Sequence, residues 1–478
     1  MPSAELLDAV PVAPDVTPAS PLIVRSGGSV LVATDALLAH LPALAELADG
    51  VESDAHRLAL ISLDLPGGAL RSALDRCEAS GFALADELRG LRLAVATAEA
   101  SYELAERTAT WLQDAASDWG ASVLARVGAQ FLPGAALSGF LAWKLAPGDD
   151  AEKKRALQKL MLDNPRLITS PGFSTLVRRV VSGTDDAVLG LAGAPPWLGV
   201  LLGEHGLGIM GVDTSAAALI VAGGASGTGY FTETPVRVER VSEQRTATAP
   251  AGAVDRLARV PDERQVRIER YLAPGEPPRY VVYVAPTQTF SPMADHEPWD
   301  LTSNVAGVAG LPAGSIRATE LAMADAGITS ADEVVFVGFS QGGLVADALA
   351  ASGSWNTVGL ETYGDPGGGI ELPEGIRGVA VRHSDDFVVA TGGPQGATDR
   401  TIVERRAYPE GSDIPTDKPA PAHQRRAYEE TARLLDAARS PELRAELDAL
   451  DAFTRDYPNR EGAEITTLRY RAERAPAG

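Results

Sequence analysis

Cysteine and lysine are scarce in this sequence, which limits what the chain can do. A single cysteine, Cys77, among 478 residues excludes a disulfide within the chain, and its place in a helical stretch indicates a structural thiol. Only five lysines stand against 64 acidic residues, and the formal net charge is −22. Such a surface repels phosphate, so ordinary nucleic-acid binding is excluded and a polybasic membrane patch is not expected.

Metal-ligand patterns and long apolar runs are missing too. The six histidines are scattered, and no H-E-x-x-H pattern or cysteine–histidine cluster occurs, so neither a metal nor another cofactor is expected. Two uncharged stretches, 127–143 and 214–232, contain proline or glycine and fall short of the ~20 apolar residues of a spanning helix, which favours buried helices. The acidic, proline-rich N-terminus is atypical of a secretory signal, which leaves the cytoplasm or export without a cleavable signal.

What is present suits a folded chain of two or three domains, because 45% of the residues are hydrophobic. Residues 1–30 are rich in proline, alanine and serine and predict a flexible leader. Residues 31–230 predict a helical region, in which the part beyond 118 is apolar and rich in glycine. Residues 235–440 predict an α/β domain, and 441–478 a C-terminal helix and polar tail.

The first part of the helical region is expected to form two antiparallel arms. Leucines recur at three- and four-residue spacing from Leu37 to Leu47, and again from Leu74 to Leu112. A Pro-Gly-Gly turn at 66–68 separates the two patterns. We expect the leucine stripes to be buried against each other. Further helical segments are expected near 150–162 and 171–182.

The pattern changes near residue 234. Residues 235–241 and 265–270 alternate with period two and predict half-exposed strands, with a short helix over 253–260 between them. Continuous apolar runs at 280–284 and 334–337 are typical of buried parallel strands. Because helical patterns separate these runs, the sequence predicts a doubly wound, mostly parallel sheet.

The most informative residues are Gly338-Phe-Ser-Gln-Gly342, a G-x-S-x-G pattern placed between the strand ending at residue 337 and a helical run from 344 to 349. A strand that turns directly into a helix strains the backbone of Ser340, and its neighbours Gly338 and Gly342 must lack side chains to avoid collision. The helix N-terminus then directs its amides at the place where an oxyanion develops. The competing interpretation is a glycine-rich turn that binds phosphate or nothing. The lysine of a P-loop does not follow this turn in the sequence.

In this region the chain resembles α/β-hydrolases, in particular the lipase-like branch whose nucleophile turn reads G-[HF]-S-x-G-G. Three further segments, 299–304, 364–366 and 386–388, are similar to segments of that superfamily. The resemblance covers about 235–440 and implies an oxyanion hole made by the amides of Gln341 and Thr287. It departs from the pattern at Pro286, which stands where glycine is usual and has no N–H.

A serine nucleophile needs a histidine base held by a carboxylate, and in this fold the order is serine, acid, histidine. Two histidines follow Ser340: His423, in a loop before the last predicted helices, and His383, on the strand 379–383. His423 is preferred because of its order and position. Asp386 fits an Asp-x-Val pattern and is preferred as the acid. The alternative acids, each at a predicted strand end, are Asp385 and Asp365.

The helical front half resembles the WXG100-like hairpins of actinobacterial export substrates. Residues 119–120 are Trp-Gly, without the middle residue of the W-x-G motif. Tyr102 and Glu106 match the Y-x-x-x-[DE] spacing of the export signal of those systems. An ordinary helix face explains the tyrosine and glutamate equally well. A role as lid, substrate-access element or oligomerisation element is the alternative.

Together these features predict a serine esterase or lipase-like hydrolase that forms an acyl-enzyme. The high negative charge favours a neutral ester, either a small molecule or a lipid, over an anionic substrate. Contact with a membrane is left open. The alternative is an exported interaction protein with a catalytically silent hydrolase-like domain, which would bind a helical-hairpin partner through 31–117.

Overall fold

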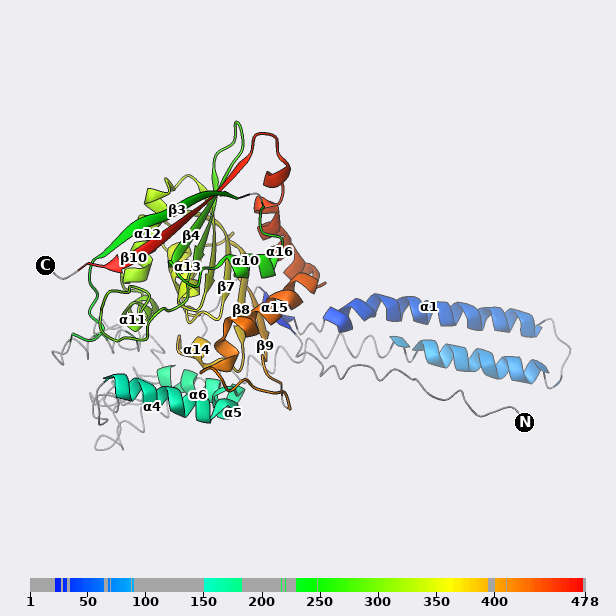
Figure 1. Ribbon diagram of the computed structural model, residues 1–478. Helices are drawn as coiled ribbons and strands as arrows, with labels where there is room; N and C mark the ends of the chain where they lie inside the picture. Colours follow the sequence, from blue (N-terminus) through cyan, green and yellow to red (C-terminus); the bar gives the residue numbers. More distant parts are fainter. Residues whose placement is uncertain are drawn as a thin grey trace, which may run out of the picture.

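The apolar runs near residues 280 and 335 become neighbouring strands in the middle of one sheet (Figure 1). The computed structural model describes residues 22–26, 29–31, 35–63, 70–86, 88–89, 150–182, 229–246, 248–393, 400–409 and 411–475, together with Gly68, Ala216 and Ile220. In sheet order the strands are β2 (Ser29–Leu31), β1 (Ile23–Ser26), β9 (Thr401–Arg405), β8 (Arg377–His383), β7 (Asn356–Tyr363), β6 (Glu333–Phe339), β5 (Arg279–Val284), β4 (Val266–Leu272), β10 (Glu464–Arg474) and β3 (Val236–Thr246).

The described part of the chain is therefore an α/β protein with a mixed sheet. Strands β5 to β9 pair in parallel, whereas β4, β10 and β3 on one side and β1 and β2 on the other join antiparallel. The prediction of an alternating strand–helix order is confirmed for the centre. The expectation of a mostly parallel sheet is confirmed only for the central strands β5 to β9, because the strands at both edges join antiparallel.

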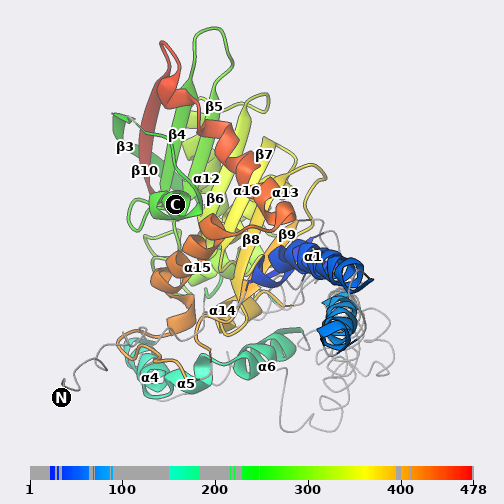
Figure 2. The same ribbon diagram turned by 90° about the vertical axis from the view of Figure 1, so that its right-hand side faces the viewer.

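Helices cover both faces of the sheet (Figures 1 and 2). The helices whose apolar side chains pack on one face are α10 (Ala253–Arg259), α15 (Arg425–Ala437) and α16 (Pro441–Thr454). The helices on the other face are α12 (Gly314–Asp325) and α13 (Gln341–Ala351), with α11 (Leu301–Val308) beside α13. The expected short helix over 253–260 is confirmed as α10. The sheet is thus buried between two apolar layers, as continuous hydrophobic strands require.

Two predicted boundaries were wrong. The expected polar tail contains β10, which lies between β4 and β3 inside the sheet, and the helix over 441–454 packs against the same sheet. The expected leader, residues 1–30, contains β1 and all but the last residue of β2, and β1 pairs with β9 at the opposite edge. In both cases the strand partners lie hundreds of residues away in sequence, so local composition did not reveal the pairing.

The predicted helical arms form a hairpin, but its interface differs from the prediction. Helix α1 (Asp35–Leu63) lies beside a helical segment that covers 70–86 (Figure 1). Leu47 and Leu84, expected in the interface, are exposed. The residues buried between the helices are Ala48, Ala55, Ala85 and Ser62. Positions 48, 55 and 62 are seven apart and so share one helix face, and their small side chains let the helices approach closely.

Three more helices, α4 (Asp150–Asp163), α5 (Pro165–Ile168) and α6 (Pro171–Ser182), confirm the helical segments expected near 150–162 and 171–182. Cys77 is exposed on the hairpin. The candidate export residues Tyr102, Glu106 and 119–120, like the apolar stretch 127–143 and most of 214–232, lie outside the described residues. Among the described helices, none is both long and apolar enough to cross a membrane.

Candidate active site

Ser340 occupies the sharp turn between β6 and α13. Its backbone has φ 55° and ψ −124°, a conformation that a residue with a side chain rarely adopts. A Cβ on Gly338 would lie 2.2 Å from the carbonyl oxygen of Gly342, and one on Gly342 would lie 2.1 Å from that of Val284. The predicted strand–turn–helix arrangement is therefore present. As expected, a side chain at either glycine would collide with the backbone.

His423 reaches Ser340 from a different part of the chain. It ends the short 3-10 helix η2 (Pro421–His423), directly before α15. Its Nε2 lies 2.8 Å from Ser340 Oγ, and its Nδ1 lies 2.6 Å from Asp386 Oδ2. With the carboxylate accepting from Nδ1–H, Nε2 is the nitrogen that can accept the serine proton. Both distances fall in the hydrogen-bonding range expected for a nucleophile, base and acid.

Asp386 is fixed by three donors. Its Oδ1 accepts from the Val388 N–H at 2.9 Å, which caps the short helix α14 (Phe387–Ala390). Its Oδ2 accepts from Tyr428 Oη at 2.9 Å as well as from His423. The side chain is buried, so both its position and the direction of its lone pairs are set by these contacts.

The other acids considered lie elsewhere. The two oxygens of Asp385 accept from the backbone N–H groups of Ala407 and Tyr408 at 2.8 and 2.9 Å. Burial raises the pKa of Asp385. Asp365 accepts from the Thr362 hydroxyl at 2.7 Å and from a backbone amide. Each of these two carboxylates thus stabilises its own loop and has no described hydrogen bond to His423.

His383 is a buried structural histidine. Its Nδ1 lies 2.8 Å from the carbonyl oxygen of Ala422, and its Nε2 lies 2.7 Å from Thr431 Oγ1. Burial lowers its pKa to about 4, so the ring is neutral at pH 7. By holding Ala422, it anchors the loop that carries His423.

Sequence reasoning missed Tyr428. Its ring stacks on His383 at 3.9 Å between centroids, and its hydroxyl binds Asp386. On another side it contacts Gly364, where φ is +59° and an added Cβ would lie 2.9 Å from the tyrosine. The Gly-Asp-Pro segment at 364–366 was noted as a resemblance, and this close approach explains its glycine. Only the folded structure reveals the tyrosine, because its partners come from three other elements.

The two expected oxyanion donors lie on adjoining elements. Gln341 is the first residue of α13, and Thr287 follows the end of β5. The close contact of Gly342 with the Val284 carbonyl places the start of α13 against that strand end. Within the described residues, neither the Thr287 N–H nor the Gln341 N–H donates a hydrogen bond. Both amides are thus available to a ligand oxygen.

The helical segment α4–α6 lies beside the end of the sheet that carries this site (Figure 2). Helix α6 packs on α14, the helix that follows Asp386, and the rings of Phe173 and Phe387 meet edge to face with centroids 5.6 Å apart. Only 5% of Ser340 is exposed. The apolar, glycine-rich stretch 185–230 lies almost wholly outside the described residues.

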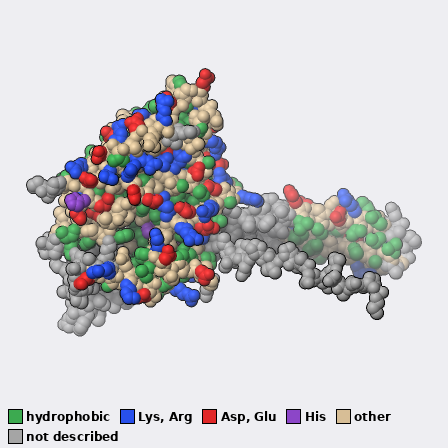
Figure 3. Space-filling view, in the orientation of Figure 1, with side chains coloured by type: hydrophobic (Ala, Val, Ile, Leu, Met, Phe, Trp, Pro, Cys, Tyr) green, Lys and Arg blue, Asp and Glu red, His purple; other side chains and the backbone are tan. Residues whose placement is uncertain are grey.

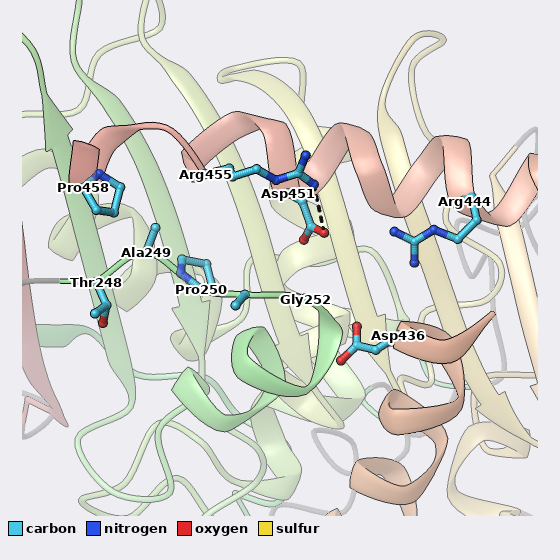
Figure 4. Close-up of a pocket in the computed structure, with 10 residues that line it drawn as sticks. Thr248, Ala249, Pro250, Gly252, Asp436, Arg444, Asp451, Arg455 and Pro458 are labelled. Atoms are coloured by element: carbon cyan, nitrogen blue, oxygen red, sulfur yellow. Dashed lines mark hydrogen bonds and ion pairs between the residues drawn. The ribbon is translucent and has the colours of Figure 1, made fainter. Parts of the chain in front are cut away.

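A separate pocket of about 490 Å³ lies between α16, the end of α15 and the loop before α10 (Figure 4). Its charged side chains are engaged in structural contacts. Asp436 accepts from the first amides of α10, and Arg455 pairs with Asp451 at 3.4 Å. None of Ser340, His423 or Asp386 lines it. We therefore assign this pocket no part in the chemistry.

Among the described residues, no three His, Cys, Asp or Glu side chains gather in a way that would hold a metal ion. The residues that meet at the site are the strained Ser340, His423 and Asp386, whose carboxylate accepts three hydrogen bonds. No family model matches the chain, and no curated protein or solved structure matches it at a significant level.

Proposed function

We propose that the protein is a serine hydrolase that cleaves carboxylic esters, with an α/β-hydrolase type of active site. The observation that carries the proposal is the contact of His423 Nε2 with Ser340 Oγ at 2.8 Å, at a strained turn, with Asp386 on the other ring nitrogen. A hydroxyl is a weak nucleophile unless a base removes its proton, and this arrangement supplies that base.

In the first half-reaction Ser340 Oγ attacks the ester carbonyl carbon while its proton moves to His423 Nε2. The carbonyl oxygen becomes an oxyanion, which the amides of Gln341 and Thr287 stabilise. Asp386 holds the imidazolium in place. When the intermediate collapses, the C–O bond to the alcohol breaks, the alcohol takes the proton from His423, and the acyl group stays on Ser340.

In the second half-reaction a water molecule gives its proton to His423 and attacks the acyl-enzyme. A second oxyanion forms in the same place and collapses, which releases the carboxylic acid and returns the proton to Ser340. No step needs a metal ion or an oxidant. A formal charge of −22 favours a neutral ester as substrate.

The direct test is hydrolysis of p-nitrophenyl butyrate by the full chain. We expect Ser340→Ala to lose at least ~10⁴-fold in kcat, because the nucleophile is gone. Ser354→Ala removes an exposed serine hydroxyl and is the matched control, with activity unchanged. Retention of full activity in folded Ser340→Ala would overturn the proposal.

The alternative, an interaction protein without turnover, has one observation in its favour. Leu60, Ile61 and Leu70, which flank the turn of the helical hairpin, are each more than half exposed. That exposure is compatible with an active hydrolase too. A folded chain that does not react at Ser340 with an active-site probe would favour this alternative.

A further inference from the structure

One short segment contacts both residues that carry the unengaged amides. The segment 299–304 runs from a buried tryptophan into the first turn of α11. The carbonyl oxygen of Trp299 accepts from the N–H groups of Gln288 and Thr289 at 2.8 and 3.1 Å. These two bonds hold the loop after β5 immediately beyond Thr287.

Asn304 reaches Thr287 itself. Its Nδ2 donates to Thr287 Oγ1 at 2.9 Å. The preceding residue, Pro286, has no N–H, so Thr287 is the first residue of this loop whose amide can serve the oxyanion. Among the described residues the Asn304 contact is the one that fixes the Thr287 side chain. Because Oγ1 is joined to the Thr287 backbone through Cβ and Cα, this bond also restricts the movement of the Thr287 backbone.

The same segment contacts the residue after the nucleophile. The side chain of Gln341 is fully buried, and its Nε2 lies 3.3 Å from the carbonyl oxygen of Asp300 and 3.4 Å from Ser315 Oγ. The start of α13 and the loop after β5 therefore share one support. Movement of that support would change the relative position of both amides.

The segment 299–304 is itself held by further contacts. Asp300 caps α11 by accepting from the Ser303 N–H at 2.8 Å. Arg474, the last residue of β10, donates to both oxygens of Asp300 at 3.0 Å. Asn304 thus stands on a capped helix that is tied to the sheet, as a group that positions another group needs.

We propose that Asn304 is a positioning residue for the oxyanion hole: through its hydrogen bond to Thr287 Oγ1 it holds the Thr287 amide toward the oxygen of the tetrahedral intermediate. The inference rests on the proposed ester hydrolysis. It goes further by assigning a role to a residue that does not touch substrate. Because a misplacement of about 1 Å can cost ~10²-fold in rate, one such bond matters.

The test combines Asn304→Leu and Thr287→Val, which keep shape and remove the donor and the acceptor respectively. We expect each to lower kcat on p-nitrophenyl acetate by about 10- to 100-fold with KM within twofold, because the bond acts in the transition state. The double variant should be no slower than the slower single variant, as for two partners of one contact. Asn356→Leu, at the opposite end of β7 from the site, is the matched control and should keep wild-type kcat.

The rate at which a fluorophosphonate labels Ser340 is measured alongside, and should fall with kcat. Wild-type kcat and labelling in both single variants, or losses that multiply in the double variant, would overturn the role of Asn304 while leaving the hydrolase proposal intact. If Asn304→Leu does not fold, Thr287→Val alone decides between these outcomes. A folded wild-type chain that neither labels nor hydrolyses would overturn both proposals.

Discussion

His423 Nε2 lies 2.8 Å from Ser340 Oγ although 83 residues separate them in the chain. The serine is held by the β6–α13 turn, and the histidine by η2 and the buried His383 behind it. The contact therefore exists only when the parallel strands, α13 and α15 are all in place. The contact between His423 and Ser340 thus depends on the stability of the sheet.

The neighbouring carboxylates Asp385 and Asp386 provide a matched comparison. We expect Asp386→Asn to lower kcat/KM by about 10²- to 10⁴-fold, because the amide keeps the shape but cannot stabilise the imidazolium. Asp385→Asn should stay within a few-fold of wild type, since that carboxylate binds two backbone amides and not the histidine. Instead, Asp385→Asn should lower the free energy of unfolding, measured with urea, by about 1–3 kcal/mol. Equal activity losses in both variants would contradict the assignment.

Gly342→Ala tests the sterics of the turn. An added Cβ would lie 2.1 Å from the Val284 carbonyl oxygen and 2.6 Å from that of Ala285, and backbone cannot move aside cheaply. We expect a loss of several kcal/mol or failure to fold. Gly310→Ala is a control for glycine replacement, because its Cβ would meet no atom within 4 Å and only its positive φ opposes it. A Gly342→Ala protein as stable as Gly310→Ala would show that the turn is not closely packed.

His383 predicts a pH dependence of stability. Its pKa is lowered by burial to about 4, against 6.5 for the ordinary side chain, with Asp386, Arg405 and His423 as charged or titratable neighbours. Between pH 6.5 and 4 the unfolded state binds a proton that the folded state does not, so this stabilising contribution is present above pH 6.5 and is lost as pH falls. Between pH 7.5 and pH 5.0, the free energy of unfolding measured with urea should fall by about 2 kcal/mol more in the wild type than in His383→Asn. If the free energy of unfolding changed equally with pH in both proteins, the role of His383 would be contradicted.

Arg474 connects the C-terminal strand to the segment that supports the site. Its guanidinium is buried and binds Asp300 and Glu233, at distances of 3.0 and 2.6 Å. Arg474→Leu leaves these carboxylates without their cation and should cost about 3–5 kcal/mol. Arg471→Leu, on an exposed side chain of the same strand, should change stability by about 0.5 kcal/mol or less. If urea unfolding gave similar losses for both, the role of the Arg474 cluster would be refuted.

The central strands and the serine turn could be predicted because their signals are local. A continuous apolar run predicts a buried strand, and glycines around a serine between a strand and a helix predict a strained turn. Because the histidine follows the serine in this fold, only the two histidines after Ser340 remained candidates for the base. Choosing Asp386 over Asp385 relied on a pattern of neighbours, and the structure places only Asp386 against the ring.

The features that were missed depend on contacts between distant parts of the chain. Strand β10 alternates apolar and polar residues over 468–473, but its place in the sheet is set by pairing with β3 and β4, about 200 residues earlier. The hairpin interface uses Ala48 and Ala55 because close helix contact favours small side chains over the more hydrophobic leucines. Tyr428 acts through a hydroxyl that only the folded chain brings to Asp386. No periodicity in the sequence reports such contacts.

The most direct test of the central claim is mass spectrometry of the intact, folded chain after reaction with a fluorophosphonate probe. We expect one adduct per chain, on the peptide that contains Ser340, with no adduct in Ser340→Ala and strongly slowed labelling in His423→Ala, because the base that activates the hydroxyl is gone. Ser354→Ala should label as the wild type does. A folded wild-type chain that forms no adduct at Ser340, or that labels equally well without His423, would contradict the account.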